Sequence, residues 1–327
     1  NRQMSEFHLP GPDVEREQQL QDILTDNWFS PTSGHEITKE KAKEFFEENH
    51  CKLNKEQVHV VETVQKLLKE YTELSEIGTI AGELKEFVAF LDAPGGTGKT
   101  FTLNVLISWL IMREKSVACT AASGIAATML HNGRTCHNQF NFPIDVTADS
   151  TCREESELIS FLQEVQLIII DEATMLDKWY YEALDRTLRY ATGRKEVKFG
   201  GKVVLISGDF RQLLEVIPGA NRAKTVSRCL KGSDKLWDDN VIRLQLRNNM
   251  RVQNALDQRP NDEEFERQLR SHEQWLLDLG EGKLPTRGHN IVEIPQHMCM
   301  DSKEDVISHV FDDFENNIGV PEYFQSR

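Results

Sequence analysis

Short apolar runs alternate with longer stretches of helical periodicity through the middle of the chain. The apolar runs predict buried strands at residues 87–91, 116–120, 167–170 and 203–207. The stretches between them repeat apolar residues at helical spacing and predict helices at residues 101–112, 124–130 and 179–190. Because strands alternate with helices, we expect an α/β fold in which a parallel sheet is covered by helices on both faces.

The chain before the first predicted strand divides into two parts. Residues 1–50 are polar and acidic and are interrupted by three prolines, so we expect a loosely ordered leader with one short helix at residues 38–48. A firmer helix is predicted after Asn54, because Asn54 is a favourable N-cap and Gln57 completes a capping box. Two later polar stretches predict a surface excursion and a charged linker, at residues 141–157 and 254–266.

The composition limits the class of protein. The chain has 327 residues, 39% of them hydrophobic, which is enough for two domains with real cores. No apolar run approaches the roughly 18 residues that span a bilayer, and no signal-peptide pattern opens the chain, so we expect an intracellular protein without membrane partners. Six cysteines without a C-x-x-C pair argue against a zinc site or a disulfide framework. The net charge of −15 is unfavourable for nucleic-acid binding, although it leaves room for a local basic groove.

The segment from Ala93 to Thr100 has the pattern of a phosphate-binding loop, with alanine in place of the usual first glycine. It follows a predicted strand and opens a predicted helix, which is the context that such a loop needs. Its glycines let backbone N–H groups surround phosphates, Lys99 can reach the β and γ oxygens, and the Thr100 hydroxyl can ligate Mg²⁺. The alternative is a glycine-rich turn without a ligand. The expected nucleotide-binding residues are Pro94, Gly95, Gly96, Thr97, Gly98, Lys99, Thr100 and Phe101.

Two carboxylates follow the third predicted strand. Asp171 is expected to hold Mg²⁺, and Glu172 is placed to orient and deprotonate a water that attacks the γ-phosphate of a nucleoside triphosphate. Gln212, after the next strand, could contact the γ-phosphate and that water. The alternatives are an acidic pair that faces solvent and a turn without chemistry.

Several of these segments together resemble a known family. Residues 171–175 and 208–214 are similar to the petite-integration-frequency (Pif) type of superfamily-one DNA helicase, including the helicase part of Helitron transposons. Residues 53–57 resemble its adenine-recognising Q motif, and residues 120–127 resemble its motif for contact with single strands. Further similar segments lie at residues 133–137 and 248–251.

The resemblance implies a RecA-like P-loop NTPase domain, followed by the start of a second RecA-like domain. It implies an ATP-dependent DNA helicase that moves 5′ to 3′ on single-stranded DNA and unwinds forks, with ATP and Mg²⁺ as cofactors. It also implies roles in DNA repair, recombination, telomere maintenance or transposition, and a location in the nucleus, with the mitochondrion as a further site.

The family's catalytic residues can be transferred to matching positions of this chain. Lys99, Glu172, Gln212 and Arg251 would be catalytic, with Gln212 sensing the γ-phosphate and Arg251 acting as an arginine finger on the developing charge. Gln57 would read the adenine edge. The alternatives are that Gln57 only caps a helix and that Arg251 is a surface arginine.

The resemblance also implies DNA contacts. Thr120, Ser123, Thr135 and His137 would touch the DNA backbone or bases, and Phe140 is a candidate platform for base stacking. His137 and Phe140 could instead be ordinary packing residues. Glu215 stands where the family usually has proline, a change that we expect the loop to tolerate.

These features suggest a leader at residues 1–50, a first motor domain at residues 51–250, and a linker with a truncated second motor domain at residues 251–327. Nothing after Arg251 resembles the later helicase motifs, and the chain begins with Asn1, so we expect a fragment that lacks the C-terminal motor domain of its parent. Two other functions stay open. One is a catalytically silent nucleotide- and DNA-binding remnant of a mobile-element helicase, and the other is an unrelated phosphate-loop ATPase or kinase.

Overall fold

Six parallel strands form a sheet with the order β3-β2-β4-β5-β1-β6. The computed structural model describes residues 36–76, 85–143, 145–153, 155–288, 291–318, 320 and 323. It divides into two compact units, residues 1–269 and residues 270–327, and the sheet belongs to the first. The strands are β1 (Phe87–Asp92), β2 (Val117–Ala121), β3 (Arg134–Thr135), β4 (Leu167–Asp171), β5 (Val203–Gly208) and β6 (Ile242–Gln245).

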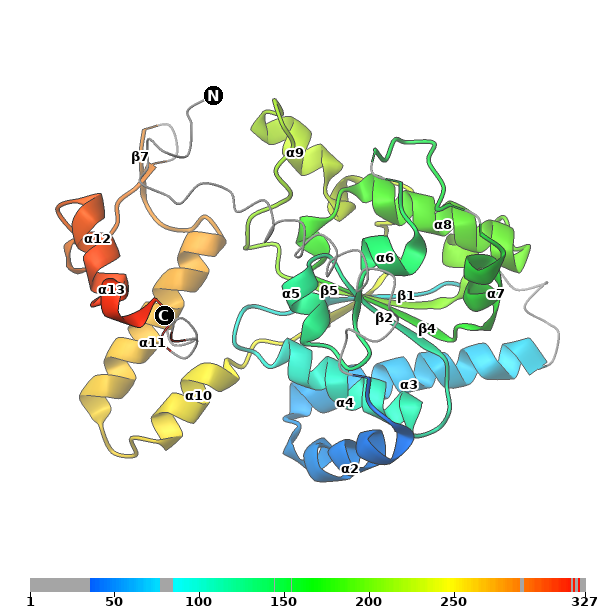
Figure 1. Ribbon diagram of the computed structural model, residues 1–327, viewed down its shortest axis with the longest axis horizontal. Helices are drawn as coiled ribbons and strands as arrows, with labels where there is room; N and C mark the ends of the chain where they lie inside the picture. Colours follow the sequence, from blue (N-terminus) through cyan, green and yellow to red (C-terminus); the bar gives the residue numbers. More distant parts are fainter. Residues whose placement is uncertain are drawn as a thin grey trace. The chain divides into compact units, whose positions relative to one another are not determined.

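Helices cover both faces of this sheet, and a hydrophobic core fills the space on each side (Figure 1). On one face the core includes side chains of α3 (Lys55–Glu76) and α4 (Lys99–Ile111), and α2 (Lys39–Asn49) packs against α4. On the other face it includes side chains of α6 (Cys136–Phe140), α7 (Ser156–Glu164) and α8 (Lys178–Thr192). The predicted α/β architecture is therefore confirmed. The remaining elements of this unit are η2 (His50–Lys52), α5 (Gly124–Thr128), η4 (Ala173–Met175), η5 (Lys198–Gly201), α9 (Arg222–Arg228), η6 (Leu230–Gly232) and α10 (Met250–Asp257).

Parallel register brings the carboxyl ends of the central strands together. Asp92 at the end of β1 lies opposite Gly208 at the end of β5 and opposite Gln245 at the end of β6. The end of β4 at Asp171 is paired with Ala121 of β2. Because all four predicted strands are present and parallel, the segments that follow them meet at one edge of the sheet, where ligands of open α/β sheets bind.

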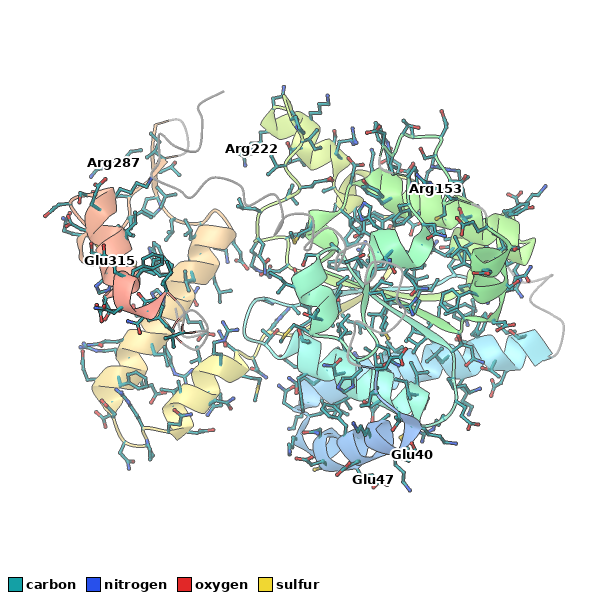
Figure 2. All side chains as sticks on the ribbon, in the orientation of Figure 1. Glu40, Glu47, Arg153, Arg222, Arg287 and Glu315 are labelled. Atoms are coloured by element: carbon teal, nitrogen blue, oxygen red, sulfur yellow. The ribbon has the colours of Figure 1, made fainter. Side chains whose placement is uncertain are left out.

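Helix α2 corrects the expectation of a loose leader. The predicted short helix is present, but Ala42 on it is fully buried. Just before the helix, the Ile37 N–H donates to the side chain of Asn132 at 2.8 Å. Glu40 and Glu47 lie on its exposed side (Figure 2). The described part of the leader thus contains a helix that packs on the domain through one face, and residues 1–35 lie outside the described residues.

The predicted surface excursion at residues 141–157 is anchored in the core. Phe142 and Cys152 are buried, and the Cys152 N–H donates to the Thr187 hydroxyl of α8 at 3.0 Å. The predicted linker at residues 254–266 is shorter than expected, because α10 extends through Asp257 and α11 (Glu263–Gly280) begins soon after it. Residues 251–269, part of the segment predicted to be a linker and the start of a second motor domain, belong to the first compact unit.

The second unit contains short elements after α11. They are β7 (Thr286–Arg287), β8 (Ile291–Val292), η7 (Gln296–Met298), α12 (Lys303–Val310) and α13 (Phe314–Asn317). Strands β7 and β8 pair in antiparallel fashion, so the described part of this unit adds no strand to the parallel sheet. The start of a second RecA-like domain here stays a prediction.

Candidate functional site

The predicted phosphate-binding loop connects β1 to α4, as the sequence indicates. Gly96 and Gly98 adopt left-handed backbone conformations, with φ of 87° and 79°, which other L-residues rarely adopt. Gly98 is the N-cap of α4 and provides no side-chain cap, so the first N–H groups of the helix have no partner within it. The loop therefore presents free backbone donors at the positive end of a helix dipole, which suits a phosphate group.

One polar side chain and one backbone N–H group bind carbonyl groups of the loop. The Gln57 amide donates to the Thr97 carbonyl at 3.1 Å, and the Arg251 N–H at the start of α10 donates to the Gly96 carbonyl at 3.2 Å. A Cβ atom on Gly96 would lie 2.4 Å from Oδ1 of Asn249, and one on Gly98 would lie 2.5 Å from Nε2 of Gln57. Backbone conformation thus favours glycine at these two positions, and a larger residue would also displace the side chain of Asn249 or Gln57.

Gln57 acts as a capping residue in this structure. Its Oε1 accepts the Asn54 N–H at 3.0 Å, and its own N–H donates to Oδ1 of Asn54 at 3.0 Å, which completes the predicted capping box. Because Nε2 binds Thr97 and the residue is only 2% exposed, it presents no accessible edge to an adenine. The geometry favours the capping interpretation over the predicted adenine contact.

Lys99 joins the loop to the acidic pair. Its ammonium group lies 2.6 Å from Oδ1 of Asp171 and 2.7 Å from Oε1 of Glu172. Burial alone would lower the pKa of Lys99, but the two carboxylates outweigh it and hold that pKa above its usual range. The structure therefore brings three predicted site residues from two separate motifs into direct contact.

The end of β4 holds the two carboxylates in different environments. Oδ1 of Asp171 accepts hydrogen bonds from the Ser207 hydroxyl at 2.7 Å and from the Glu172 N–H at 2.9 Å, which fixes its orientation. Glu172 has a left-handed backbone, with φ 56° and ψ 47°, a conformation that non-glycine residues rarely adopt and that is common at functional sites. Its Oε2 is buried and has no hydrogen-bond partner within the described part of the chain. The orientation of the Asp171 carboxylate is thus fixed by hydrogen bonds, and the Glu172 carboxylate keeps one oxygen that no described group binds.

These residues fit a magnesium-bound triphosphate. Mg²⁺ prefers oxygen ligands, and the Asp171 carboxylate and the Thr100 hydroxyl, on the first turn of α4, are oxygen donors at the same edge of the sheet. The unpartnered Oε2 of Glu172 could accept a hydrogen bond from a water molecule. The backbone donors at the start of α4, these oxygens and Lys99 are therefore of the kinds that a magnesium-bound triphosphate needs.

The structure also locates the two other predicted catalytic residues. Arg251 lies against the phosphate loop through its backbone, and its side chain is exposed. Gln212 is exposed on the turn after β5, at the same edge of the sheet, and its N–H donates to the Asp209 carbonyl at 3.0 Å. The described hydrogen bonds do not join the Gln212 side chain to Lys99, so its role stays a prediction.

Three of the predicted DNA contacts lie at the margin of the sheet near β3. The Ser123 hydroxyl accepts the Ala126 N–H at 3.2 Å and caps α5, and the Thr135 hydroxyl accepts the Asn138 N–H at 3.3 Å and caps α6. The His137 side chain is exposed at the start of α6. These positions are compatible with a strand of DNA on the surface, and their contacts with DNA stay predictions.

Two predicted DNA contacts require correction. Thr120 is fully buried and donates its hydroxyl to the Ile169 carbonyl at 2.6 Å, because its strand β2 lies between β3 and β4. Phe140 is also fully buried, with its ring centroid 5.7 Å from that of Phe142. Neither side chain can reach a nucleic acid in this structure, and Phe140 is a core residue.

Several residues of the site were missed by sequence reasoning. Ser207 orients Asp171, and Asn249 caps α10 behind the loop by accepting the Arg251 and Val252 N–H groups. Asparagine before a helical stretch is a recognisable N-cap signal, so Asn249 could have been found. Tyr180 lies beside His137, with ring centroids 4.8 Å apart, and no sequence signal links these two residues.

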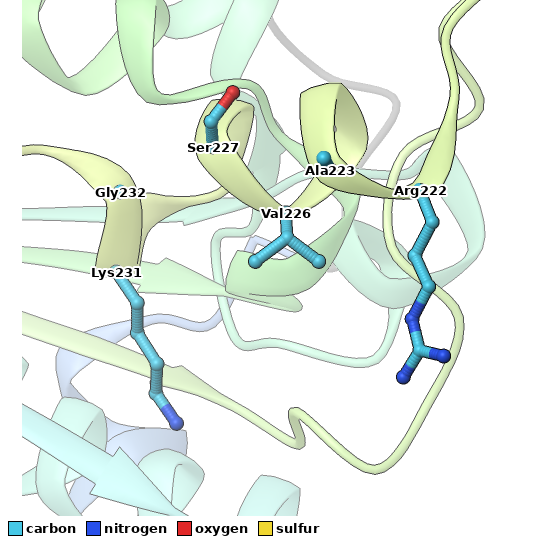
Figure 3. A pocket seen from close by; sticks show the side chains of 6 residues that line it. All are labelled: Arg222, Ala223, Val226, Ser227, Lys231 and Gly232. Carbon is cyan, nitrogen blue, oxygen red and sulfur yellow. The ribbon is translucent and has the colours of Figure 1, made fainter.

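A separate surface groove of about 650 Å³ lies along α9 and η6 (Figure 3). The side chains of Arg222 and Lys231 border it, with Val226 between them (Figure 3). None of the predicted site residues lines this groove. The candidate chemistry therefore lies at the phosphate loop and not in this groove.

The described residues contain neither a cluster of metal ligands nor a membrane-spanning helix. They contain no group of three or more His, Cys, Asp or Glu side chains that could hold a metal ion by themselves. None of the helices described is long and apolar enough to cross a membrane.

Comparison with known proteins places the chain in a family. The family model for PIF1-like helicases matches residues 52–290. The chain belongs to the PIF1-like helicase family. This confirms the resemblance found in the sequence, and the match includes the phosphate loop, the acidic pair and the segments that carry Gln212 and Arg251.

Individual PIF1-like relatives cover parts of the chain. The ATP-dependent DNA helicase PIF1 of Trypanosoma brucei brucei is 34% identical over 133 residues, which are 40% of this chain and 13% of the relative. The ATP-dependent DNA helicase Pif1 of a Psychrobacter species is 37% identical over 130 residues, 38% of this chain and 19% of the relative. The chain thus aligns with less than a fifth of either relative. The crystal structure of Pif1 helicase from Candida albicans matches 81% of this chain and 55% of that chain with a TM-score of 0.52 and 18% identity, which supports the shared fold.

Proposed function

We propose that this chain is the ATP-hydrolysing part of a DNA helicase that moves 5′ to 3′ on single-stranded DNA and unwinds forks. The observation that carries the proposal is the contact of the Lys99 ammonium group with both Asp171 and Glu172, at 2.6 and 2.7 Å. This contact unites the phosphate loop with the carboxylates that hydrolysis needs. Membership of the PIF1-like family supports the choice of DNA helicase among phosphate-loop enzymes.

Nucleotide binding would use the free donors of the loop and the cation of Lys99. ATP phosphates would accept the backbone N–H groups at the start of α4, and Lys99 would exchange one or both carboxylates for the β and γ oxygens. Bound Mg²⁺, held by Thr100 and Asp171, would neutralise charge on the phosphates. Ser207 would keep Asp171 oriented throughout, because its hydroxyl binds the same carboxylate.

Hydrolysis would depend on Glu172 as general base. Its unpartnered Oε2 would accept a proton from the attacking water, with Gln212 and Arg251 acting on the γ-phosphate. The backbone contact of Arg251 with Gly96 supports this role, because it holds the residue beside the phosphate loop.

DNA would bind along the margin formed by α5 and α6. Ser123, Thr135 and His137 are the accessible contacts there. The relatives described above are named ATP-dependent DNA helicases, which supports a DNA substrate. Roles in repair, recombination, telomere maintenance or transposition are part of this proposal and follow from the family resemblance alone. We also propose a nuclear location, with the mitochondrion as a further site. Unwinding would need a second motor domain, because translocation requires two domains that close and open around ATP.

The test is ATP hydrolysis by the 327-residue chain, with and without single-stranded DNA, beside the Lys99→Ala variant. We expect Mg²⁺-dependent turnover that single-stranded DNA raises and that the variant lacks. The net charge of −15 favours one competing function, a silent binding remnant, which would bind ATP and not hydrolyse it. Turnover without any effect of DNA would instead indicate an unrelated phosphate-loop ATPase and overturn the helicase proposal.

A further inference from the structure

Arg211 lies one residue before the predicted γ-phosphate sensor and makes an unusual set of contacts. Its Nη1 donates to Oδ1 of Asp92 at 2.9 Å, and its Nη2 donates to Oδ2 of Asp92 at 3.2 Å. Nη1 also donates to Oδ1 of Asp209 at 2.9 Å. One guanidinium group therefore binds one carboxylate with both of its terminal nitrogens and a second carboxylate with one of them.

The two carboxylates belong to different parts of the site. Asp92 is the last residue of β1, and the phosphate loop follows it directly. Asp209 follows the last residue of β5 and begins the turn that leads to Gln212. Arg211 thus connects the strand that carries the phosphate loop with the turn that carries the predicted sensor.

Asp209 shapes this turn through its backbone and its side chain. Its carbonyl accepts the Gln212 N–H at 3.0 Å, and its Oδ1 accepts the Arg211 N–H at 3.1 Å. This is the pattern of a turn closed by an aspartate side chain. The guanidinium of Arg211 binds the same Oδ1, so it fixes the side chain that closes the turn.

The neighbouring backbone leaves the turn little freedom to adjust. The Ala93 N–H donates to the Gly208 carbonyl at 3.2 Å, and the Leu246 N–H donates to the Asp92 carbonyl at 3.0 Å. A Cβ on Gly208 would lie 3.0 Å from the Ala173 nitrogen, immediately after Glu172. The base of the turn is thus packed between the phosphate loop and the acidic pair, and Gln212 itself is exposed beyond it.

We propose that Arg211 is a positioning residue that holds the turn of residues 208–213 so that Gln212 meets the γ-phosphate. The inference rests on the proposed function, because it assumes that ATP binds the loop and that Gln212 senses its γ-phosphate. Arg211 acts through Gln212 and does not touch the nucleotide. Lysine in its place keeps the positive charge but cannot donate two parallel hydrogen bonds to Asp92. The Arg211→Lys variant therefore tests the paired hydrogen bonds separately from the charge.

The experiment measures how strongly the chain prefers a nucleotide with a γ-phosphate. Fluorescent ADP and the non-hydrolysable analogue AMP-PNP are titrated, each with Mg²⁺, into the wild type, Arg211→Lys, Gln212→Ala and the double variant. A second single variant, Asp92→Asn, weakens the same contact from its other side. We expect each single variant to lower the preference for AMP-PNP about tenfold while ADP affinity stays unchanged, as the loss of one charge-assisted interaction implies.

The matched control is Arg189→Lys on α8. Arg189 is 26% exposed and binds Asp185 at 2.8 Å, and Arg211 is 24% exposed and binds Asp92 at 2.9 Å. The end of α8 precedes β5, so Arg189 lies toward the opposite edge of the sheet. This variant should keep the wild-type preference. Unchanged ADP affinity in every variant shows that the loop is still folded.

The double variant separates positioning from independent effects. If Arg211 acts through Gln212, the double variant loses no more preference than either single variant. Additive losses would overturn the inference, as would a loss in Gln212→Ala with a wild-type preference in Arg211→Lys, and both results would leave the proposed function intact. If the wild type binds both nucleotides but Gln212→Ala keeps the full preference, the sensor role of Gln212 fails and the inference fails with it. Absence of nucleotide binding by the wild type would overturn the proposed function itself.

Discussion

Two regions border the same sheet. The nucleotide region is the phosphate loop with Lys99, Asp171 and Glu172, and the DNA margin is α5 and α6, the proposed site of DNA contact. They differ in the interactions that hold their side chains in place. In the nucleotide region, glycine conformations, helix capping and ion pairs hold the loop, Lys99 and the acidic pair in direct contact. At the DNA margin, α5 and α6 are short, and side chains that are near neighbours in sequence point alternately to solvent and to the core. His137 is exposed, and Phe140 on the same helix is fully buried.

This difference shows which kind of site can be read from sequence. Phosphate binding uses backbone N–H groups, so a short pattern of glycines determines the geometry almost by itself. Contact with a DNA base or backbone uses side chains, and exposure decides which of them can take part. Thr120 and Phe140 match the expected positions in sequence, but the sheet and the core bury them. Substitutions in the nucleotide region should therefore act mainly on ATP hydrolysis. Substitutions of buried residues at the DNA margin should act mainly on the free energy of unfolding.

The largest expected effect is that of Glu172→Gln. The amide keeps the size of the side chain but cannot accept a proton, so kcat for ATP hydrolysis should fall about a thousandfold. ATP affinity should stay within a few-fold of the wild type, since Lys99 and Asp171 remain. Steady-state hydrolysis and nucleotide titration measure the two quantities.

The control for this variant is Glu164→Gln. Glu164 is the exposed last residue of α7, at the edge where β4 begins, and its replacement should leave kcat unchanged. Equal activity of Glu172→Gln and the wild type would mean that the acidic pair does not supply the base, which would break the proposed contrast between the two regions.

The next largest effect is expected for Phe140→Ala, at the DNA margin. Phe140 is fully buried, so the cavity should lower the free energy of unfolding by about 3–5 kcal/mol, as measured by denaturant titration. His137→Ala, three residues earlier on the exposed side of α6, should change the free energy of unfolding by less than about 0.5 kcal/mol.

Phe140→Leu separates packing from base stacking. Leucine fills most of the cavity and should cost less than about 1.5 kcal/mol, so the protein stays folded without the aromatic ring. Its affinity for single-stranded DNA should equal that of the wild type. A weakening by about 1–3 kcal/mol would show that Phe140 stacks on a base after all, in an arrangement that differs from this structure.

Much of the fold could be predicted because its strongest signals are local. The strands β1, β2, β4 and β5 are apolar runs, and each is buried in the sheet, where such runs are stable. The capping box of Asn54 and Gln57 also formed as predicted, because both partners lie within one helical turn. Contacts of this kind need no knowledge of distant parts of the chain.

The features that sequence reasoning missed depend on distant contacts. Strand β6 has only one buried residue, Leu244, and it is a strand because it pairs with β1. The polar leader forms α2, which buries Ala42 and packs against α4. Asn249, which caps α10, lies against Gly96 of the phosphate loop, and these two residues are far apart in the sequence. In each case tertiary packing outweighs the local pattern.

A smaller effect is expected for Gly96→Ala in the phosphate loop. The backbone φ of 87° disfavours alanine, and the new Cβ would lie 2.4 Å from Oδ1 of Asn249 and displace this cap. The free energy of unfolding should fall by about 2 kcal/mol, and nucleotide affinity should weaken with it. Gly95→Ala, where a Cβ meets nothing within 4 Å, should change the free energy of unfolding by less than about 0.5 kcal/mol. Equal effects of the two variants would show that the loop is not held by its packing against Asn249.

The smallest effect concerns the pH dependence of DNA binding through His137. Partial burial of the ring beside Tyr180 and Phe142 lowers the pKa of His137 from its ordinary value, so the ring is neutral at pH 7.5 and gains a proton as the pH falls. Protonation adds a cation at the DNA margin, so affinity for single-stranded DNA should rise roughly threefold between about pH 7.5 and pH 5.5 at constant salt. The affinity for single-stranded DNA is measured at both pH values for the wild type and for His137→Ala. The difference between the two proteins gives the part of the rise that is due to His137, because all other titrating groups are shared. An equal rise in the variant would exclude His137 as a DNA contact, and the margin would then be defined by Ser123 and Thr135 alone.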